Sequence, residues 1–199
     1  MWEIEEELKN DGHLYICGVD EAGRGPLAGP VFAASVILPF KAKIPCLNDS
    51  KKLSETKREK LFEEIKEVAV AYAIASADHK EIDNLNILNA TYLAMNRAIE
   101  ALAIIPSIAL IDGNRSSGIR CKNKCIIGGD GTSASIAAAS ILAKVSRDRY
   151  MVETAAVYPE YLFERHKGYG TKLHYEKLRE YGPSEIHRMS FLKNLNKSW

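Results

Sequence analysis

The sequence predicts an α/β protein in which a mixed β-sheet is flanked by helices, with a small helical appendage at the C-terminal end. The first two strands are expected in the apolar runs 14–19 and 31–38, the second of which is rich in β-branched residues, and the compact turn between them favours antiparallel pairing. Amphipathic helical patterns then alternate with further short apolar runs. Strands followed by alternating helices and strands are typical of an α/β sheet that begins with an antiparallel hairpin.

Apolar periodicity and capping residues place the individual elements. Gly12 ends a short surface helix near the N-terminus, and Ser54 is a good N-cap for a helix over residues 55–68. Asp83 or Asn84 is expected to cap a long helix over 86–103. The other expected elements are strands at 68–77 and 108–112, a short apolar run at 126–127, and helices at 134–154 and 172–181.

The composition indicates a globular chain with one main core, because 46% of the 199 residues are hydrophobic and 27% are charged. The formal net charge of +1 neither favours nor excludes a nucleic-acid partner, since the distribution of charge matters more. The stretch 165–199 carries eight Lys and Arg against three Glu. We therefore expect a catalytic core over residues 1–158 and a basic C-terminal helical region over 159–199 that packs on it.

The four cysteines argue against a zinc site and favour a reducing compartment. Cys121 and Cys125 have no second pair of Cys or His close in sequence, and the other two are scattered. The chain opens with no signal peptide and contains no apolar run of 18 or more residues. The cytoplasm is the expected location, and no contact with a membrane is expected.

Acidic residues follow three of the apolar runs, and each lies beside or near glycine. Asp20 and Glu21 come after the first strand, and Asp112 and Asp130 come after two later runs. One acid in such a place is commonly an ordinary turn or cap residue, whereas three such places suggest a shared metal site at one edge of the sheet. Converging carboxylates repel one another, and a pair of Mg²⁺ or Mn²⁺ ions offsets that repulsion. Two such ions activate a water and stabilise the leaving oxygen in phosphodiester hydrolysis.

Six motifs make the sequence similar to one family. They are GVDEAGRGPLAGP at 18–30, NDSKKL at 48–53, IDGN at 111–114, GDGTSASIAAASILAKVSR at 129–147, HKGYGT at 166–171 and HRMSF at 187–191. In this order, and over nearly the whole chain, they resemble ribonuclease HII, the type 2 ribonuclease H family. The first motif alone is highly specific to that family.

The resemblance implies a ribonuclease H fold and a metal-dependent endoribonuclease. Such an enzyme hydrolyses the RNA strand of RNA–DNA hybrids and cuts 5′ of ribonucleotides embedded in duplex DNA, leaving 3′-hydroxyl and 5′-phosphate ends. The family's catalytic acids, which hold two Mg²⁺ or Mn²⁺ ions, match Asp20, Glu21, Asp112 and Asp130 of this sequence.

The resemblance also implies residues that recognise the ribonucleotide. Gly23-Arg24-Gly25 matches the motif that binds the 2′-hydroxyl through its backbone, and glycine suits this task because a chain without Cβ brings its amides close to a ligand. Arg24 can add a phosphate contact. Tyr169 matches the tyrosine that packs on the sugar of the next nucleotide and favours a deoxyribose there.

Further substrate contacts are implied around the cut and on the opposite strand. Lys51 and Lys144 resemble residues that contact phosphates near the cut, and Arg188 and Ser190 are expected to touch the DNA strand. The sequence departs from the family pattern at residues 128–130, where Gly-Gly-Asp replaces the frequent Lys-Gly-Asp. Loss of that positive charge is expected to weaken phosphate contacts without abolishing cleavage.

Two other functions stay open at this point. A ribonuclease HIII-like hybrid nuclease usually carries an extra N-terminal substrate-binding domain, whereas only about a dozen residues precede the first expected strand. A catalytically inactive hybrid-binding module is the other alternative, although all four acids are present. We expect a monomer, and contact of the C-terminal tail with a sliding clamp is a further option that no clear motif supports. His166 and His187 are interpreted as packing or hydrogen-bonding residues.

Overall fold

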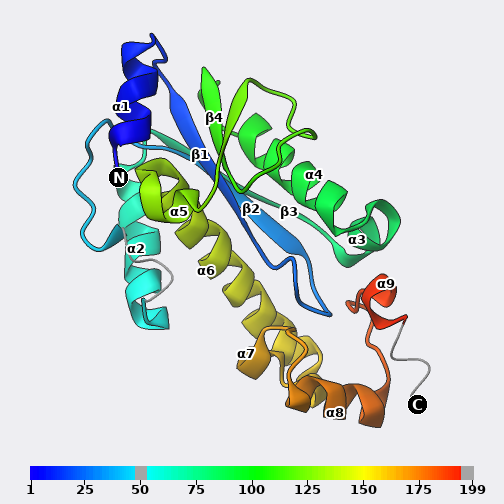
Figure 1. Ribbon diagram of the computed structural model, residues 1–199. Helices are drawn as coiled ribbons and strands as arrows, with labels where there is room; N and C mark the ends of the chain where they lie inside the picture. Colours follow the sequence, from blue (N-terminus) through cyan, green and yellow to red (C-terminus); the bar gives the residue numbers. More distant parts are fainter. Residues whose placement is uncertain (48–52, 194–199) are drawn as a thin grey trace.

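A computed structural model describes residues 1–47 and 53–193, which form a five-stranded mixed sheet with helices on both faces (Figure 1). The strands are β1 (Ile16–Ala22), β2 (Val31–Ile37), β3 (Ala71–Ala77), β4 (Ile108–Asp112) and β5 (Asn123–Ile126), in the order β3-β2-β1-β4-β5. β2 is antiparallel to β1 and β3, whereas β4 is parallel to β1 and β5. The predicted α/β class with an opening antiparallel hairpin is confirmed.

The helices of the described ranges mostly follow the predicted bounds. They are α1 (Glu3–Asn10), α2 (Glu55–Val68), α3 (His79–Leu85), α4 (Ile87–Glu100), α5 (Gly129–Thr132), α6 (Ala134–Val157), α7 (Phe163–His166), α8 (Lys172–Tyr181) and α9 (Met189–Leu192), with a 3-10 turn at Pro159–Tyr161. The cap predicted at Asp83 or Asn84 is wrong. Asp78 caps α3 instead, and Asn86, with φ 67°, caps α4. The positive φ of Asn86 interrupts the helical path, so two helices occupy this region.

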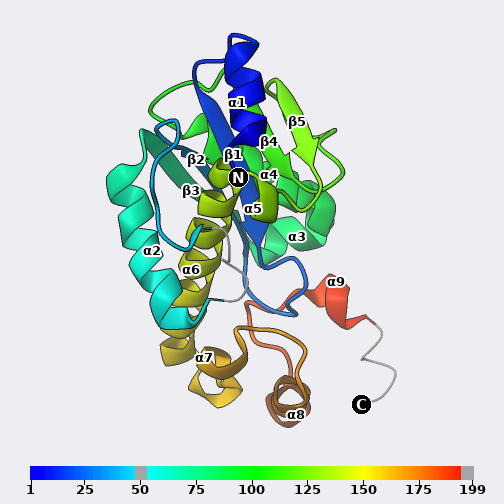
Figure 2. The same cartoon turned by 60° about the vertical axis from the view of Figure 1, so that its left-hand side comes forward.

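The sheet has a core on each face because successive strand residues point to opposite sides. Cys17 and Val19 of β1 pack in the cluster formed with α4, whereas Ala34 and Val36 of β2 pack in the cluster formed with α2 and α6. Figures 1 and 2 show α2 and α6 on one face of the sheet and α4 on the other. Since β1 is the central strand, the residues that follow it lie between the two helical layers.

The helix α6 lies very close to β1, and Gly18 permits this approach. A Cβ on Gly18 would lie 2.0 Å from the carbonyl carbon of Ser135 and 2.2 Å from the backbone nitrogen of Ile136. Residues 134–139 of α6 are Ala, Ser and Ile, and all of them are buried. Small side chains on the helix and no side chain at Gly18 therefore place the start of α6 directly against the central strand.

Gly18→Ala is expected to destabilise the fold by about 2–3 kcal/mol, because the added methyl group meets backbone atoms that cannot rotate away. Urea unfolding of the variant and the wild type measures the difference. Gly131→Ala is a matched control, since a Cβ there would meet nothing within 4 Å. Equal stability of the two variants would contradict the close packing of α6 on β1.

The C-terminal part of the described chain packs against the end of α6 and the loop after β1. Phe163, Leu178 and Ile186 are buried there together with Leu27 of the loop and Met151 of α6. Figure 1 shows α7 and α8 at the end of α6. The predicted boundary at residue 158 stays a prediction, because one apolar cluster includes residues from both sides of it.

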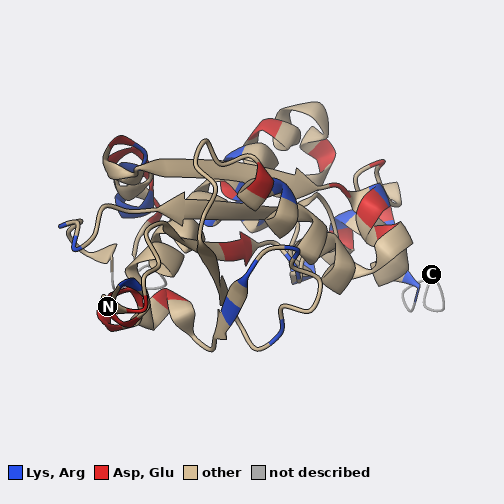
Figure 3. Ribbon diagram, turned by 90° about the horizontal axis from the view of Figure 1, so that it is seen from above, with Lys and Arg blue, Asp and Glu red and all other residues tan. Residues whose placement is uncertain are grey.

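Charges of both signs are interspersed over the surface elements of the molecule (Figure 3). Where residues are described, no helix is both long enough and apolar enough to span a bilayer. Because positive and negative residues are mixed in Figure 3, surface charge alone does not mark a functional site, and burial and position must identify it.

Three buried histidines lie together in the C-terminal cluster. The rings of His166 and His174 stack with their centroids 4.4 Å apart, and His174 Nε2 lies 3.0 Å from His187 Nε2. Loss of hydration, with a smaller effect of the neighbouring imidazole, lowers the pKa of His174 to about 4 and that of His187 to about 3. Both rings are therefore neutral in the folded protein at pH 7.

The free energy of unfolding is expected to decrease as the pH falls below about 6.5, because these two histidines are protonated more readily in the unfolded chain. The unfolded chain takes up their protons there, whereas the folded protein takes them up only at about pH 4 and about pH 3. Each histidine thus contributes a loss of up to about 1.4 kcal/mol per pH unit in this window, and its contribution is intact above it.

The measurement compares urea unfolding of the wild type and of His187→Gln at pH 7, 6 and 5. The comparison with a variant is needed because the raised pKa of Asp20 makes the folded protein more stable as the pH falls, which opposes the effect of the histidines. The variant should lose less stability than the wild type between pH 7 and pH 5. The same loss in both proteins would show that His187 does not stay neutral in the fold.

Candidate active site

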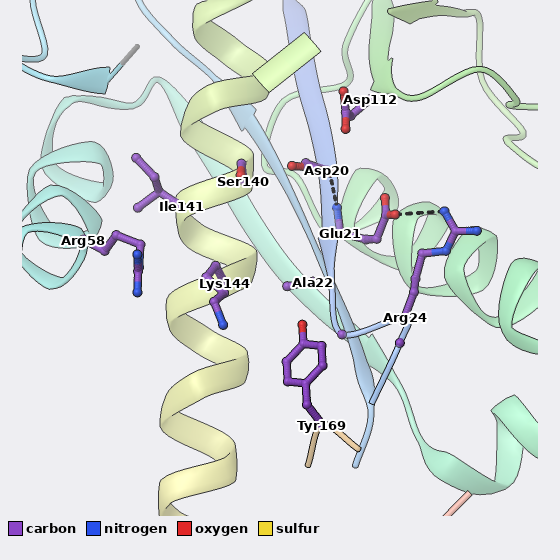
Figure 4. Close-up of a pocket in the computed structure, with 12 residues that line it drawn as sticks. Asp20, Glu21, Ala22, Arg24, Arg58, Asp112, Ser140, Ile141, Lys144 and Tyr169 are labelled. Carbon is purple, nitrogen blue, oxygen red and sulfur yellow. Dashed lines mark hydrogen bonds and ion pairs between the residues drawn. The ribbon is translucent and has the colours of Figure 1, made fainter. Parts of the chain in front are cut away.

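The ends of β1 and β4 bring three acidic side chains into one cleft of about 450 Å³ (Figure 4). Val19 of β1 pairs with Ile111 of β4 in parallel register, so Asp20 and Asp112 follow side by side at the two strand ends. Glu21 comes next in β1 and lines the same cleft. The structure therefore brings together three of the four predicted metal ligands.

Ionised carboxylates are costly in this cleft. Loss of hydration raises the pKa of Asp20 well above its usual value, and the charges of Glu21 and Asp112 raise it further. Burial also raises the pKa of Glu21, although Arg24, whose Nη1 lies 3.2 Å from Glu21 Oε1, offsets part of this effect. A bound cation would remove the repulsion, and oxygen ligands suit a hard divalent metal ion. The donor set thus fits a metal of this class.

The fourth predicted ligand, Asp130, is buried but does not line the cleft. It does not follow a strand directly, because β5 ends at Ile126 and Asp130 lies in the short helix α5. Gly128 has φ 64° just before α5, a conformation that glycine adopts without strain. The N–H of Gly129 donates to Asp112 Oδ1 at 2.7 Å, and this bond ties the segment of Asp130 to the end of β4.

The acidic side chains have protein partners in this structure. Asp20 Oδ1 accepts the N–H of Glu21 at 2.7 Å, and Glu21 is turned toward Arg24, as Figure 4 shows. Within residues 1–47 and 53–193, no group of three or more His, Cys, Asp or Glu side chains is arranged as a metal centre. The three carboxylates thus line one cleft, and one oxygen of each is bonded to a partner within the protein.

The loop Gly23–Gly25 leaves β1 and lines the same cleft as the acids. Gly23 has φ 98°, and a Cβ there would lie 2.0 Å from Arg147 Nε, so both its backbone conformation and its surroundings require glycine. Arg24 and Gly25 are exposed. The backbone of the loop is therefore accessible beside the three acids.

A fully buried arginine, Arg188, holds this loop from the inside. Its guanidinium donates to four carbonyl oxygens, those of Gly23 at 2.6 Å, Arg24 at 2.9 Å, Pro26 at 2.8 Å and Gly29 at 2.8 Å. The N–H and C=O of a planar trans peptide point in opposite directions. Because the carbonyls of Gly23 and Arg24 point toward Arg188, the N–H groups of Arg24 and Gly25 point outward, away from Arg188. The burial of Arg188 does not fit the predicted contact with the DNA strand.

Tyr169 and Lys144 also line the cleft (Figure 4). Tyr169 is 42% exposed, so its ring is available to a ligand. Lys144 lies in the middle of α6, with its Nζ 2.7 Å from Asp148 Oδ1 and 6.0 Å from the centroid of the Tyr169 ring. A cation and an aromatic face therefore lie beside the acids and the Gly23–Gly25 loop.

Residues 17–194 match the family model described as Ribonuclease HII. The chain belongs to the ribonuclease HII family. It is 60% identical over 194 residues to ribonuclease HII of Caldicellulosiruptor bescii, which covers 98% of this chain and 94% of that protein.

Solved structures of related proteins share the fold. The chain is similar to ribonuclease H2 of Pyrococcus horikoshii OT3, with 26% identity and a TM-score of 0.76 over 92% of this chain and 96% of that one. It is also similar to a chain in the PCNA:RNase HII complex from Archaeoglobus fulgidus, with 26% identity and a TM-score of 0.70 over 88% of this chain and 94% of that one.

Membership of the ribonuclease HII family establishes the class of activity. The protein is an endoribonuclease of the ribonuclease H type, a hydrolase that acts on RNA–DNA hybrids and depends on divalent metal ions. The predicted ribonuclease H-like sheet is confirmed by the likeness to the Pyrococcus horikoshii structure.

Two further predicted substrate contacts are Lys51 and Ser190. Lys51 falls outside the described residues. The backbone N–H and the Oγ of Ser190 both donate to Asp83 Oδ1, so Ser190 joins α9 to α3 and is not among the residues that line the cleft.

Sequence reasoning missed several residues that line the site. Arg58 of α2 and Ser140 of α6 line the main cleft. A second pocket of about 330 Å³ shares Glu21 and Asp112 with that cleft and is also lined by Arg115. Arg58 looks like part of a solvated helix face. Ser140 stands within the motif at 129–147 but looks like one of several small residues in α6.

Proposed function

We propose that this ribonuclease HII cuts duplex DNA on the 5′ side of embedded ribonucleotides, in addition to the RNA strand of hybrids, and leaves 3′-hydroxyl and 5′-phosphate ends. One observation carries the proposal: Asp20, Glu21 and Asp112 line a single cleft together with the Gly23–Gly25 loop. Groups for hydrolysis and groups for recognition of a ribose are thereby adjacent.

The proposed metal ligands are Asp20, Glu21, Asp112 and Asp130, with two Mg²⁺ or Mn²⁺ ions in the active complex. Bound there, such ions activate a water and stabilise the leaving oxygen. The raised pKa values of Asp20 and Glu21 support the assignment, because a bound cation would offset both the loss of hydration that mainly raises them and the smaller repulsion between the acids. The Gly129–Asp112 hydrogen bond supports a role for Asp130, since it couples the two acid-bearing segments.

Specificity for a ribonucleotide is proposed to come from the outward N–H groups of Arg24 and Gly25. A 2′-hydroxyl both donates and accepts hydrogen bonds and is the group that distinguishes RNA from DNA. The four bonds from Arg188 support this role, because they fix the carbonyl side of the loop and leave the amide side free for the substrate.

The substrate strand is proposed to run past the acids from the side of Tyr169 to the second pocket. Tyr169 packs on the sugar of the nucleotide that follows the ribonucleotide, and Lys144 and Lys51 contact phosphates near the cut. The second pocket shares Glu21, Arg24 and Asp112 with the cleft and is also lined by Arg115, and its two arginines suit a phosphate of the same strand.

Tyr169→Ala is expected to lower cleavage at a single embedded ribonucleotide by about 10-fold, because the ring loses its packing contact with the sugar, and ten-fold corresponds to about 1.4 kcal/mol. Cleavage of a uniform RNA–DNA hybrid should fall by no more than about two-fold, since a long hybrid offers many alternative positions. Both rates are measured with Mg²⁺ and with Mn²⁺, and EDTA should abolish both.

Tyr181→Ala serves as the control, because Tyr181 is an exposed tyrosine of α8 that does not line the cleft. Equal losses on the two substrates would remove the proposed role of Tyr169. Cleavage that persists in EDTA would contradict the metal assignment.

Other features of the protein remain predictions. The match to ribonuclease HII over residues 17–194 favours this activity over the ribonuclease HIII-like alternative, and the three acids in one cleft argue against an inactive binding module. The Archaeoglobus fulgidus relative was solved in complex with PCNA, which supports a clamp contact as a proposal for this chain too. The monomeric state is likewise proposed.

A further inference from the structure

Every ring nitrogen of the three buried histidines has a hydrogen-bond partner. His166 Nε2 lies 2.9 Å from the carbonyl oxygen of Tyr161, and His166 Nδ1 accepts the N–H of Gly168 at 3.2 Å. These partners place the His166 proton on Nε2. The ring is thus neutral and fully bonded.

The protons of the other two rings follow from one fixed donor. The N–H of Ser184 donates to His187 Nδ1 at 2.9 Å, so the proton of a neutral His187 is on Nε2. This proton points to His174 Nε2, 3.0 Å away, which must accept it. The proton of His174 is therefore on Nδ1, and it donates to the carbonyl oxygen of Tyr169 at 3.0 Å. The bonds run in one direction, from Ser184 through two imidazoles to Tyr169.

The two segments joined by these imidazoles also hold the loop that follows β1. The N–H of Leu27 donates to the carbonyl of Gly168 at 2.8 Å, and the N–H of Arg188 donates to the carbonyl of Leu27 at 2.9 Å. His187 forms an antiparallel bridge with Ala28. The loop thus lies between the Tyr169 segment and the Arg188 segment. The His174–His187 hydrogen bond joins these two segments directly.

We propose that the His174–His187 hydrogen bond is a positioning device that sets Tyr169 relative to the Gly23–Gly25 loop, and so determines how well a single ribonucleotide followed by a deoxynucleotide is selected. The inference rests on the proposed function of these two elements. Neither imidazole is among the residues that line the cleft, so the two histidines are positioning residues that act through the Tyr169 backbone and through the segment of Arg188.

The device requires neutral rings, and its surroundings keep them neutral. The titratable or charged groups that face the cluster are Tyr161 from the 3-10 turn, Glu164, Arg165 and Lys167 from α7 and its end, His79 from α3, and Arg188 beside His187. None of the hydrogen bonds of the three rings goes to a carboxylate. A carboxylate partner would favour imidazolium, and its absence from these bonds suits a relay of neutral donors and acceptors.

The test is a double-mutant cycle between His187→Phe and Tyr169→Ala in the full-length protein. Cleavage of a duplex with one ribonucleotide and of a uniform hybrid is measured, with kcat and KM determined separately. His187→Phe should raise KM for the single-ribonucleotide duplex by about 5-fold, because one buried hydrogen bond is lost, while kcat and the uniform hybrid change by no more than about two-fold. In the Tyr169→Ala background, His187→Phe should not change the ratio of cleavage of the single-ribonucleotide duplex to cleavage of the uniform hybrid.

Two further measurements separate positioning from general destabilisation. His187→Gln keeps an N–H donor toward His174 and should recover most of the substrate preference, whereas His13→Gln, at a histidine remote from the cluster, should behave as the wild type. Nitrogen-15 spectra of labelled histidines should show His187 protonated on Nε2 and His174 on Nδ1.

Two results would overturn the inference. They are the opposite protonation of either ring, and an effect of His187→Phe that is equal on both substrates and additive with Tyr169→Ala. A wild-type enzyme that cleaves hybrids but never cuts at an embedded ribonucleotide would instead refute the proposed function, so the two failures are distinguishable.

Discussion

Replacing Asp20 by Asn is expected to abolish cleavage and to stabilise the fold at the same time. Asp20 is buried beside Glu21 and Asp112, and its raised pKa shows that its charge is costly in the folded protein. Asn keeps the shape of the side chain but removes the charge that a metal ion requires. Turnover should fall by about 1,000-fold, the upper end of the loss that is typical of removing one essential electrostatic group.

The stability gain has a predictable dependence on pH. A group whose pKa is raised on folding weakens the folded state when it is ionised, so Asp20→Asn should gain about 1–2 kcal/mol at pH 7 in EDTA. The gain should shrink as the pH falls toward 4, where the carboxyl group begins to be protonated in the unfolded chain as well. Urea unfolding at the two pH values measures it, with the exposed Glu100→Gln as the control. A variant that is inactive and also less stable at pH 7 would contradict this account of the cleft.

Replacing Arg188 by Met is expected to cost about 3–5 kcal/mol of stability and to remove selection of the ribonucleotide. The substitution leaves four carbonyl oxygens of the loop without the charged donor that binds them. Removing one partner of such a buried charged network is among the most destabilising changes known. The loop is then free to turn its amides away from the cleft, so cleavage at a single ribonucleotide should fall further than cleavage of a uniform hybrid.

The variant Arg188→Lys separates charge from geometry. Lysine keeps the positive charge but lacks the planar fork that reaches several carbonyls at once. It should recover less than half of the lost stability, as measured by urea unfolding, and little of the preference for a single ribonucleotide. Should Arg188→Met prove as stable as the wild type, or lose only general affinity for DNA, the predicted DNA contact would be the better explanation.

Locally encoded parts of the fold were predictable from the sequence. The bounds of α2 and α8 agree with the prediction because each starts at a Ser or Thr cap whose side chain accepts a backbone N–H. The division between α3 and α4 was not predictable from apolar periodicity, because it depends on the positive φ of Asn86. The register of β1 with β4 places Asp20 beside Asp112, but the sequence supplies only the two strand ends.

Residues of the site whose role depends on distant contacts could not be placed from the sequence. Arg188 bonds to carbonyls more than 150 residues earlier in the chain, and no local pattern separates this buried arginine from a solvated one. The position of Asp130 in α5 depends on the bond between Gly129 and Asp112, which also joins separate parts of the chain. The family motifs identified these residues as important, whereas only the structure shows which of them face the cleft.

The most direct test of the account is the position of the nick in a DNA duplex that contains one ribonucleotide. The strand carrying it is labelled at its 5′ end and incubated with the protein and Mg²⁺ or Mn²⁺, beside the same duplex with deoxyribose or a 2′-O-methyl ribose at that position. We expect one nick, 5′ of the ribonucleotide, with a 3′-hydroxyl end, and no cleavage of either control duplex or by Asp20→Asn. No nick with either metal, or a nick at the same place in the control duplexes, would contradict the assignment of hydrolysis to the acids and of ribose recognition to the Gly23–Gly25 loop.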